Sequence, residues 1–168
     1  MINKDLLIQV IEELKNKNLT LGAVESFTGG LFSSALTSIS GVSKIFKGSI
    51  VSYSTLIKEN VVGVKHETIE KETVVSSSVA EEMALQGSKI LDTDITVSFT
   101  GNAGPTVCEG DKEVGLIYIS IYFEKNFYTE EYRLNIDRNA IRETAVDIAL
   151  KNILKILEKN LKNPHLCI

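Results

Sequence analysis

Hydrophobic residues recur along the chain with two alternating periodicities. Apolar positions spaced three and four residues apart predict amphipathic helices, and these cover residues 4–16, 31–39, 78–91 and 137–162. Short runs rich in β-branched and aromatic residues predict strands, which cover residues 19–24, 47–53, 94–99, 114–123 and 127–134. Ser78 and Glu81 have the spacing of a capping box at the start of the third helix. The last two strands are expected to form a hairpin that turns at Lys125-Asn126.

Alternating strands and helices predict an α/β fold, a three-layer α/β/α sandwich. The hairpin makes the expected β-sheet mixed, not wholly parallel. No repeat or linker interrupts residues 1–168, so we expect a single domain with an N-terminal helix within residues 1–18 and a tail at 163–168. In such sheets ligands bind beyond the carboxyl ends of the strands. Two loops are predicted there, at residues 25–30 and 100–105.

Composition and charge exclude several classes of function. The chain has 168 residues, of which 43% are hydrophobic, enough for a core that needs no disulfide or metal. No apolar run approaches the roughly 20 residues that a membrane span requires, and the first residues lack an apolar signal core, so we expect a cytoplasmic protein without a membrane partner. A net charge of −4 argues against broad nucleic-acid binding.

The metal-binding residue types are sparse. Cys108 and Cys167 lie far apart and form no CxxC motif, and His66 and His165 match no metal-ligand spacing. We therefore expect neither a metal nor another cofactor.

The 25–30 turn is the first candidate for chemistry. A strand leads to Ser26, and a helix follows Thr28, Gly29 and Gly30. The two glycines allow the backbone to approach a ligand closely, and the N–H groups at the helix start favour an anion or a developing oxyanion. The alternative is a tight turn in which Ser26 or Thr28 caps the helix. The stretch matches neither GxSxG nor a Walker A loop.

The 100–105 loop also follows a predicted strand. Its small residues leave backbone groups open to a ligand, and Pro105 stiffens its exit. The alternative is a loop that only reverses the chain. Its candidate binding residues are Thr100, Gly101, Asn102, Ala103 and Gly104.

A serine hydroxyl needs a neighbouring base to become a nucleophile. His66 lies in a predicted surface turn and His165 in a polar tail, so both are poor candidates. A lysine can serve if burial or a nearby positive charge keeps it neutral. Lys58 is the candidate because it follows the strand that ends at Tyr53; the alternative is an exposed lysine on a helical turn.

Two arginines open the last helix. Arg138 and Arg142 are four residues apart and share one helical face, which suits a phosphate group. The alternative is a solvated helix start with salt bridges. Arginine near a helix N-terminus opposes the helix dipole, so a local reason for the pair is expected.

The motifs together resemble the CinA C-terminal domain family. Ala23 to Gly30 (AVESFTGG) is similar to the family signature A-E-S-C-T-G-G, and Gly48 to Lys58 is similar to G-x-x-x-Y-S-N-x-x-K. Further matches follow in the family's order, over roughly residues 20–157: Val62-Gly63-Val64, Val75-Ser76, Ala80, Met83-Ala84, Thr100-Gly101, Ala103-Gly104-Pro105, Val114-Gly115, Asp137-Arg138 and Arg142.

The resemblance implies an activity. The chain is similar to the stand-alone members, the nicotinamide-nucleotide amidases, which convert nicotinamide mononucleotide and water to nicotinate mononucleotide and ammonia, a step of pyridine nucleotide salvage. The family's serine maps to Ser26, its lysine to Lys58 and its tyrosine near the site to Tyr53, so the resemblance implies that these three residues are catalytic. N–H groups from Thr28 to Gly30 are candidate oxyanion donors, and the 100–105 loop with Arg138 and Arg142 is expected to bind ribose and phosphate.

The resemblance also implies a pyridine mononucleotide as the small-molecule partner, and a homo-oligomer. The alternative function is a nucleotide-binding or interaction module with weak or lost catalysis, as the family's link to competence and DNA damage allows. Departures from the family pattern leave the serine and the lysine in place but change the expected pocket: Phe27 for cysteine, Thr55 for asparagine at a substrate-binding position, Asn102 for isoleucine, and Glu113 within a shortened loop.

Overall fold

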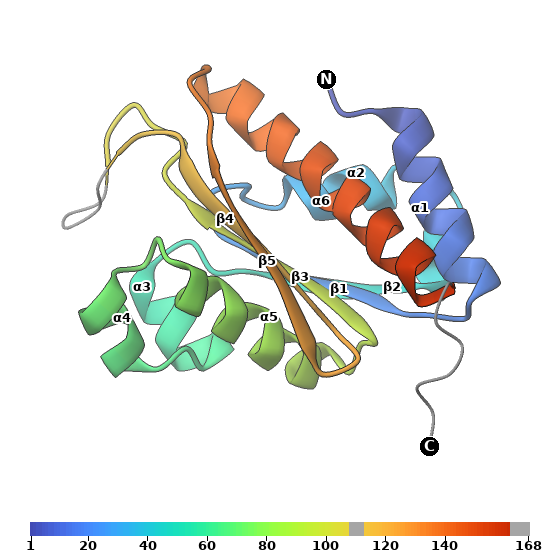
Figure 1. Ribbon diagram of the computed structural model, residues 1–168, viewed down its shortest axis with the longest axis horizontal. Helices are drawn as coiled ribbons and strands as arrows, with labels where there is room; N and C mark the ends of the chain where they lie inside the picture. The colour runs from blue at the N-terminus through green and yellow to red at the C-terminus, as the bar shows by residue number, and fades with distance from the viewer. Residues whose placement is uncertain (108–112, 162–168) are drawn as a thin grey trace.

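A five-stranded mixed sheet lies between two layers of helices (Figure 1). The strand order is β2-β1-β3-β4-β5. β1 pairs in parallel with β2 and β3, whereas β4 runs antiparallel to β3 and β5. The computed structural model describes residues 1–107 and 113–161. The strands are β1 (Leu21–Glu25), β2 (Phe46–Val51), β3 (Ile95–Gly101), β4 (Leu116–Phe123) and β5 (Asn126–Arg133).

The helices divide between the two faces of the sheet, as Figure 1 shows. One layer holds α1 (Lys4–Asn16), α2 (Leu31–Thr37) and α6 (Arg138–Leu161), and the other holds α3 (Thr55–Ile57), α4 (His66–Glu72) and α5 (Ser77–Leu91). Two shorter turns complete the described chain, the 3-10 turn η1 (Val42–Lys44) and the π-helical turn η2 (Lys58–Val62). The predicted three-layer α/β/α sandwich with a mixed sheet is confirmed.

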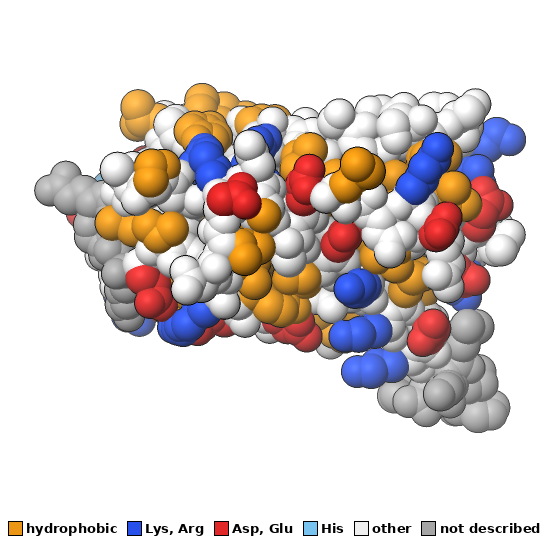
Figure 2. All heavy atoms as spheres, turned by 90° about the horizontal axis from the view of Figure 1, so that it is seen from above, with side chains coloured by type: hydrophobic (Ala, Val, Ile, Leu, Met, Phe, Trp, Pro, Cys, Tyr) orange, Lys and Arg blue, Asp and Glu red, His pale blue; other side chains and the backbone are white. Residues whose placement is uncertain are grey.

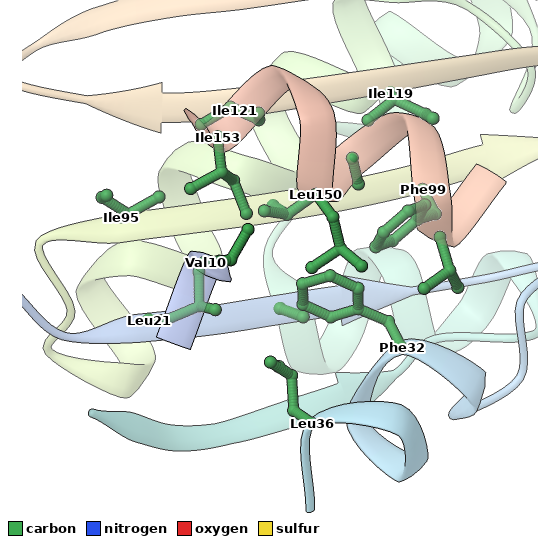
Figure 3. Close-up of a cluster of buried hydrophobic side chains, with 14 of the residues drawn as sticks. Val10, Leu21, Phe32, Leu36, Ile95, Phe99, Ile119, Ile121, Leu150 and Ile153 are labelled. Atoms are coloured by element: carbon green, nitrogen blue, oxygen red, sulfur yellow. The ribbon is translucent and has the colours of Figure 1, made fainter. Parts of the chain in front are cut away.

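The larger core fills the space between the sheet and the layer of α1, α2 and α6. Alternate side chains of β3 point to opposite faces of the sheet, so Phe99 contacts this core while Ser98 faces α5 and donates to the Ala80 carbonyl at 2.6 Å. The Phe99 ring lies 5.3 Å from the Phe32 ring of α2, and Leu150 of α6 lies beside this pair (Figure 3). A smaller core beneath α5 contains Val24, Val62, Val64, Val79 and Met83.

Several element boundaries differ from the predictions. Helix α5 begins after Ser76, whose hydroxyl accepts the Val79 N–H, so the predicted capping box at Ser78 and Glu81 is wrong; the Ser78 hydroxyl donates to Glu72 instead. His66 begins helix α4, where a turn was expected. The hairpin turns at Glu124 and Lys125, both with positive φ, and β5 already begins at Asn126. The predicted tail at 163–168 lies outside the described residues.

The two loops predicted to hold the site follow neighbouring parallel strands. The Ser26 N–H donates to the Phe99 carbonyl at 3.0 Å, so the 25–30 turn leaves the sheet directly beside the end of β3. None of the helices within residues 1–107 and 113–161 is long and apolar enough to cross a membrane. On the face that carries α1 and α6, basic and acidic side chains are interspersed (Figure 2).

Replacing Leu150 with alanine tests the larger core. Leu150 is fully buried, so Leu150→Ala removes packed methyl groups and is expected to lower the free energy of unfolding by about 3 kcal/mol, as measured by urea denaturation. Leu56 is 65% exposed and is the control, since Leu56→Ala is expected to change the free energy of unfolding by about 0.5 kcal/mol at most. Equal effects of the two substitutions would contradict this description of the core.

Candidate active site

Ser26 and Lys58 meet in a buried site at the end of β1. The Lys58 Nζ lies 2.8 Å from the Ser26 Oγ and donates a second hydrogen bond, also 2.8 Å, to the carbonyl of Ser52. The two side chains are almost inaccessible, since Lys58 is 3% exposed and Ser26 8%. A base must lie within about 2.6–3.2 Å of the proton that it removes. The pair therefore has the geometry of a nucleophile and its base.

The π-helical turn η2 places Lys58 in this position. The Ser54 hydroxyl accepts the Ile57 N–H at the start of α3, and η2 follows directly. At its end the carbonyl of Lys58 accepts the N–H groups of Gly63 and Val64, and Gly63 adopts the left-handed conformation with φ 89°. Such π-helical turns are frequent at functional sites. Val62 anchors the turn in the smaller core, which holds Lys58 toward the sheet.

Glu25 organises the turn that carries Ser26. Its carboxylate is fully buried and accepts the N–H groups of Gly30, Phe32 and Ser33 at 3.0, 3.1 and 3.0 Å. The first turn of α2 is therefore capped by Glu25, and not by Ser26 or Thr28 as the alternative reading of the turn had it. No role was predicted for Glu25; its place as an acidic residue just before a helix start is the signal that was available.

The expected oxyanion donors need correction. The N–H of Gly29 donates to the Ser26 carbonyl at 3.0 Å, and the N–H of Gly30 donates to Glu25. Both glycines have positive φ, 59° and 91°, which this tight bend requires. Within the described residues, the N–H groups of Phe27 and Thr28 make no hydrogen bond. These two groups, and not those of Gly29 and Gly30, are the ones that remain for a substrate oxygen.

A pocket of about 170 Å³ opens at Ser26. Tyr53 and Arg138 line it together with the 101–104 segment of the loop after β3, within which Asn102 is only 4% exposed. Phe27 is 5% exposed and also lines the pocket, so the residue that departs from the family pattern takes part in its wall. Two pocket residues were not predicted, because no motif pointed to them: Thr106 and Val107.

Arg138 joins two walls of the pocket. Its guanidinium donates to the Tyr53 hydroxyl at 2.9 Å and to the carbonyl of Gly104. Tyr53, which was predicted to be catalytic, is 62% exposed and follows β2. The contact therefore connects the segment after β2 with the loop after β3 and leaves Arg138 at the pocket surface.

Arg142 has a different role from the one predicted. Its guanidinium donates to the carbonyl of Thr28 at 2.8 Å, and its Nε is buried without a partner among the described residues. Arg142 does not line the pocket, whereas Arg138 does. Arg142 therefore supports the turn that carries Ser26, whereas Arg138, the other arginine predicted to bind phosphate, lies at the pocket.

Three other predicted side chains lie away from the pocket. The Thr100 hydroxyl donates to the carbonyl of Val74 at 2.6 Å, on the opposite face of β3 from Phe99. Thr55 is exposed at the start of α3, and the Thr28 hydroxyl is buried without a hydrogen-bond partner in the described part of the chain. None of the three lines the pocket, so their predicted side-chain contacts with substrate do not hold in this arrangement.

His66 is remote from this chemistry. Its ring contacts Glu59 at 2.8 Å and Glu70 at 3.2 Å, and its side chain is 64% exposed. Over residues 1–107 and 113–161, no cluster of three or more His, Cys, Asp or Glu side chains has the arrangement of a metal site.

Fold and site define an α/β domain with a buried serine and lysine pair beyond the carboxyl end of a central parallel strand. Residues 3–157 match the model of the CinA C-terminal domain, so the chain belongs to the CinA C-terminal domain family.

Relatives and solved structures agree with this assignment. The chain is 43% identical over 147 residues to a CinA-like protein of Flavobacterium psychrophilum, and 42% identical over 145 residues to a putative competence-damage inducible protein of Bacillus subtilis. These alignments cover 88% and 86% of this chain but 35% of each relative, so the chain spans about a third of their length.

Among solved structures, a competence-damaged protein (CinA) superfamily protein from Klebsiella pneumoniae has a TM-score of 0.90 at 26% identity, over 93% of this chain and 98% of that one. A competence/damage inducible protein from Agrobacterium tumefaciens has a TM-score of 0.87 at 30% identity, over 94% and 98%.

Two neighbouring carboxylates are expected to change the pKa of His66. The hydrogen bond with Glu59 and the charge of Glu70 raise the pKa of His66 above 6.5. Because this pKa is higher in the folded state than in the unfolded state, the stabilisation is fully present below pH 6.5 and is lost as the pH rises through the folded-state value. An NMR titration of the ring should show the raised pKa, and Glu59→Gln should lower it.

Glu12 lies on α1, in the opposite helical layer, so Glu12→Gln is the control and should leave the His66 pKa unchanged. A His66 pKa at or below 6.5 in the unmodified protein would contradict the contacts described.

Proposed function

We propose that this protein is an amidase that hydrolyses the carboxamide of nicotinamide mononucleotide to nicotinate mononucleotide and ammonia. The observation that carries the proposal is the 2.8 Å contact between the Lys58 Nζ and the Ser26 Oγ, made by two buried side chains of which Ser26 lines a pocket. The choice of substrate rests on the resemblance of the sequence to the nicotinamide-nucleotide amidases. The geometry supports an amidase reaction with an acyl-enzyme intermediate.

Acylation begins with transfer of the Ser26 hydroxyl proton. Lys58 accepts this proton as a neutral amine, and burial favours that form because it penalises the charged ammonium. The Ser26 Oγ forms a bond to the carboxamide carbon, and the carbonyl π electrons move to its oxygen. The carbonyl of Ser52 accepts a hydrogen bond from the Lys58 Nζ and keeps it beside Ser26 throughout.

The N–H groups of Phe27 and Thr28 are the donors that this mechanism uses for the oxyanion. They are adjacent in the chain to the nucleophile and carry no other hydrogen bond within the described residues. Fixed donors directed at developing negative charge stabilise the tetrahedral intermediate without reorganising. In this mechanism the backbone N–H groups of the turn thus stabilise the negative charge that develops on the carboxamide oxygen.

The second half of the reaction restores the enzyme. The Lys58 ammonium protonates the amide nitrogen, the carbon–nitrogen bond breaks, and ammonia departs. The acyl group remains bound to the Ser26 Oγ. Lys58, neutral again, takes a proton from water as the water oxygen attacks the acyl carbon. The bond to the Ser26 Oγ then breaks, Lys58 returns the proton to that oxygen, and the carboxylic acid product ionises on release.

Arg138 is the proposed ligand of the substrate phosphate. It is the arginine at the pocket surface, and its guanidinium already links Tyr53 to the loop at Gly104. A phosphate remote from the reacting carbon provides binding energy that holds the amide in place. Asn102 and the backbone of the 101–104 segment, which line the pocket, are the proposed contacts of the ribose.

Removing either member of the pair should abolish turnover. Ser26→Ala deletes the nucleophile and Lys58→Met deletes the base, so each is expected to lower kcat by at least about 10³-fold in an ammonia-release assay. Binding of the mononucleotide should remain, as measured by calorimetry. Lys89→Met, at an exposed position of α5, is the matched control and should retain wild-type kcat.

Two outcomes would contradict the proposal. Wild-type turnover in folded Lys58→Met would exclude Lys58 as the base. A wild-type protein that binds the mononucleotide but releases no ammonia would favour the alternative, a nucleotide-binding module of the competence and damage-inducible type.

The phosphate contact predicts a substrate-dependent effect of Arg138. A hydrogen bond to a charged group contributes about 1.5–3 kcal/mol, so Arg138→Ala should raise KM for the mononucleotide about 10- to 100-fold. KM for the dephosphorylated riboside should change about threefold at most, because that substrate lacks the phosphate. The measurement is steady-state kinetics with both substrates.

Arg133 lies outside this pocket and pairs with Glu113 and Glu131, so Arg133→Ala is the control and should leave both KM values unchanged. Equal increases for the two substrates in Arg138→Ala would remove the phosphate role.

A further inference from the structure

The Glu25 carboxylate is an unusual group to find beside a nucleophile. It is 0% exposed, and no Lys or Arg side chain of the described residues forms an ion pair with it. Burying an unpaired carboxylate is costly unless hydrogen bonds compensate. Here the compensation comes from the N–H groups of Gly30, Phe32 and Ser33 and from the Ser33 hydroxyl.

These contacts fix the bend between β1 and α2 from the inside. The side chain of Glu25 reaches forward to the first turn of α2, while its backbone stays in the sheet, where its carbonyl accepts the Ser52 N–H at 2.8 Å. Ser26 is the next residue, and its own N–H is bound to the Phe99 carbonyl. The nucleophile is therefore held between a strand and a helix that one side chain connects.

The same contacts decide which backbone donors remain free. The N–H groups of Gly30, Phe32 and Ser33 would otherwise attract an anionic ligand to the start of α2. Glu25 occupies them, so the substrate phosphate is left to Arg138. The N–H groups of Phe27 and Thr28, in the bend itself, make no hydrogen bond with any described group.

We propose that Glu25 is a positioning residue for the reaction. By binding the first turn of α2, its carboxylate sets the bend so that the Ser26 Oγ and the N–H groups of Phe27 and Thr28 face the same substrate carbonyl. Glu25 itself does not touch the reacting atoms. This inference rests on the proposed amidase function.

The test compares two buried or partly buried carboxylates that cap helices. In Glu25→Gln one oxygen becomes an NH₂ group that cannot accept the N–H groups of α2, so the bend should relax. Misplacement of reacting groups by about 1 Å costs about 100-fold, and we expect kcat to fall by about that factor while KM changes about threefold at most. A loss in kcat without a rise in KM marks an interaction used in the transition state.

Glu82 provides the matched control. Its carboxylate accepts the Lys65 N–H at 2.8 Å and the Thr68 hydroxyl at 2.7 Å at the start of α4, away from the pocket. Glu82→Gln should lower thermal stability but leave kcat at the wild-type value. If a general loss of stability explained the effect of Glu25→Gln, both variants would lose kcat in proportion to their loss of stability.

A second readout does not depend on the amide substrate. A fluorophosphonate labels an activated serine: the bond from the Ser26 Oγ to phosphorus forms, the phosphorus–fluorine bond breaks, fluoride leaves, and Lys58 takes the hydroxyl proton. The labelling rate, followed by mass spectrometry, should fall about 100-fold in Glu25→Gln and remain unchanged in Glu82→Gln. If the wild type labels at Ser26 but releases no ammonia, the proposed substrate is wrong while the role of Glu25 is still tested by labelling.

A milder variant covers the case in which Glu25→Gln does not fold. Ser33→Ala removes one of the four hydrogen bonds to the carboxylate and leaves the three N–H contacts. The loss of one hydrogen bond to a charged group is expected to reduce kcat and the labelling rate about fivefold. Wild-type kcat and wild-type labelling in a folded Glu25→Gln, or in Ser33→Ala where the first does not fold, would overturn the proposal.

Discussion

The backbone pairing of β1 with both of its neighbours is the constraint on which the site depends. At the end of β1 the Glu25 carbonyl accepts the N–H of Ser52, the residue after β2, and the next N–H, that of Ser26, donates to Phe99 in β3. The carbonyl of Ser52 then accepts the Lys58 Nζ, which reaches back to the Ser26 Oγ. Ser26 and Lys58, 32 positions apart, thus meet because a short series of hydrogen bonds connects both to the parallel sheet.

Three charged side chains hold the loops around these hydrogen bonds, and two of them do so against the preference of the helix dipole. Arg138 and Arg142 lie in the first turns of α6, where a positive charge is unfavourable. Each donates to a backbone carbonyl of one of the two site loops, Gly104 for Arg138 and Thr28 for Arg142. Glu25 shows the complementary case, since its negative charge lies at the start of α2 where a helix favours it. Glu25, Arg138 and Arg142 therefore each stabilise a loop of the site through hydrogen bonds to its backbone.

The sequence predicted the layers, the mixed sheet and the two loops because these follow from periodicity and from glycine-rich turns. It also singled out Ser26, Lys58 and Arg138, whose residue types carry chemistry. The errors have a common cause. The side chains of Thr100 and Arg142 were assigned to the site from their neighbours in the chain, but their direction depends on strand pleating and on packing against another loop. Glu25 was passed over because its place before a helix start predicts a capping role but does not reveal that its carboxylate is fully buried.

Two of the departures from the family pattern, Asn102 and Phe27, lie in the two site loops. Asn102 replaces isoleucine, yet its N–H donates to Leu116 and its carbonyl accepts the Gly115 N–H, so the loop is held whatever side chain it carries. Phe27 replaces cysteine, packs into the larger core, and keeps its N–H beside the nucleophile. Phe27 and Asn102 both line the pocket, and Ser26 and Lys58 remain in contact at 2.8 Å. The 25–30 turn thus provides both Ser26 and part of the pocket wall, while Lys58 comes from η2.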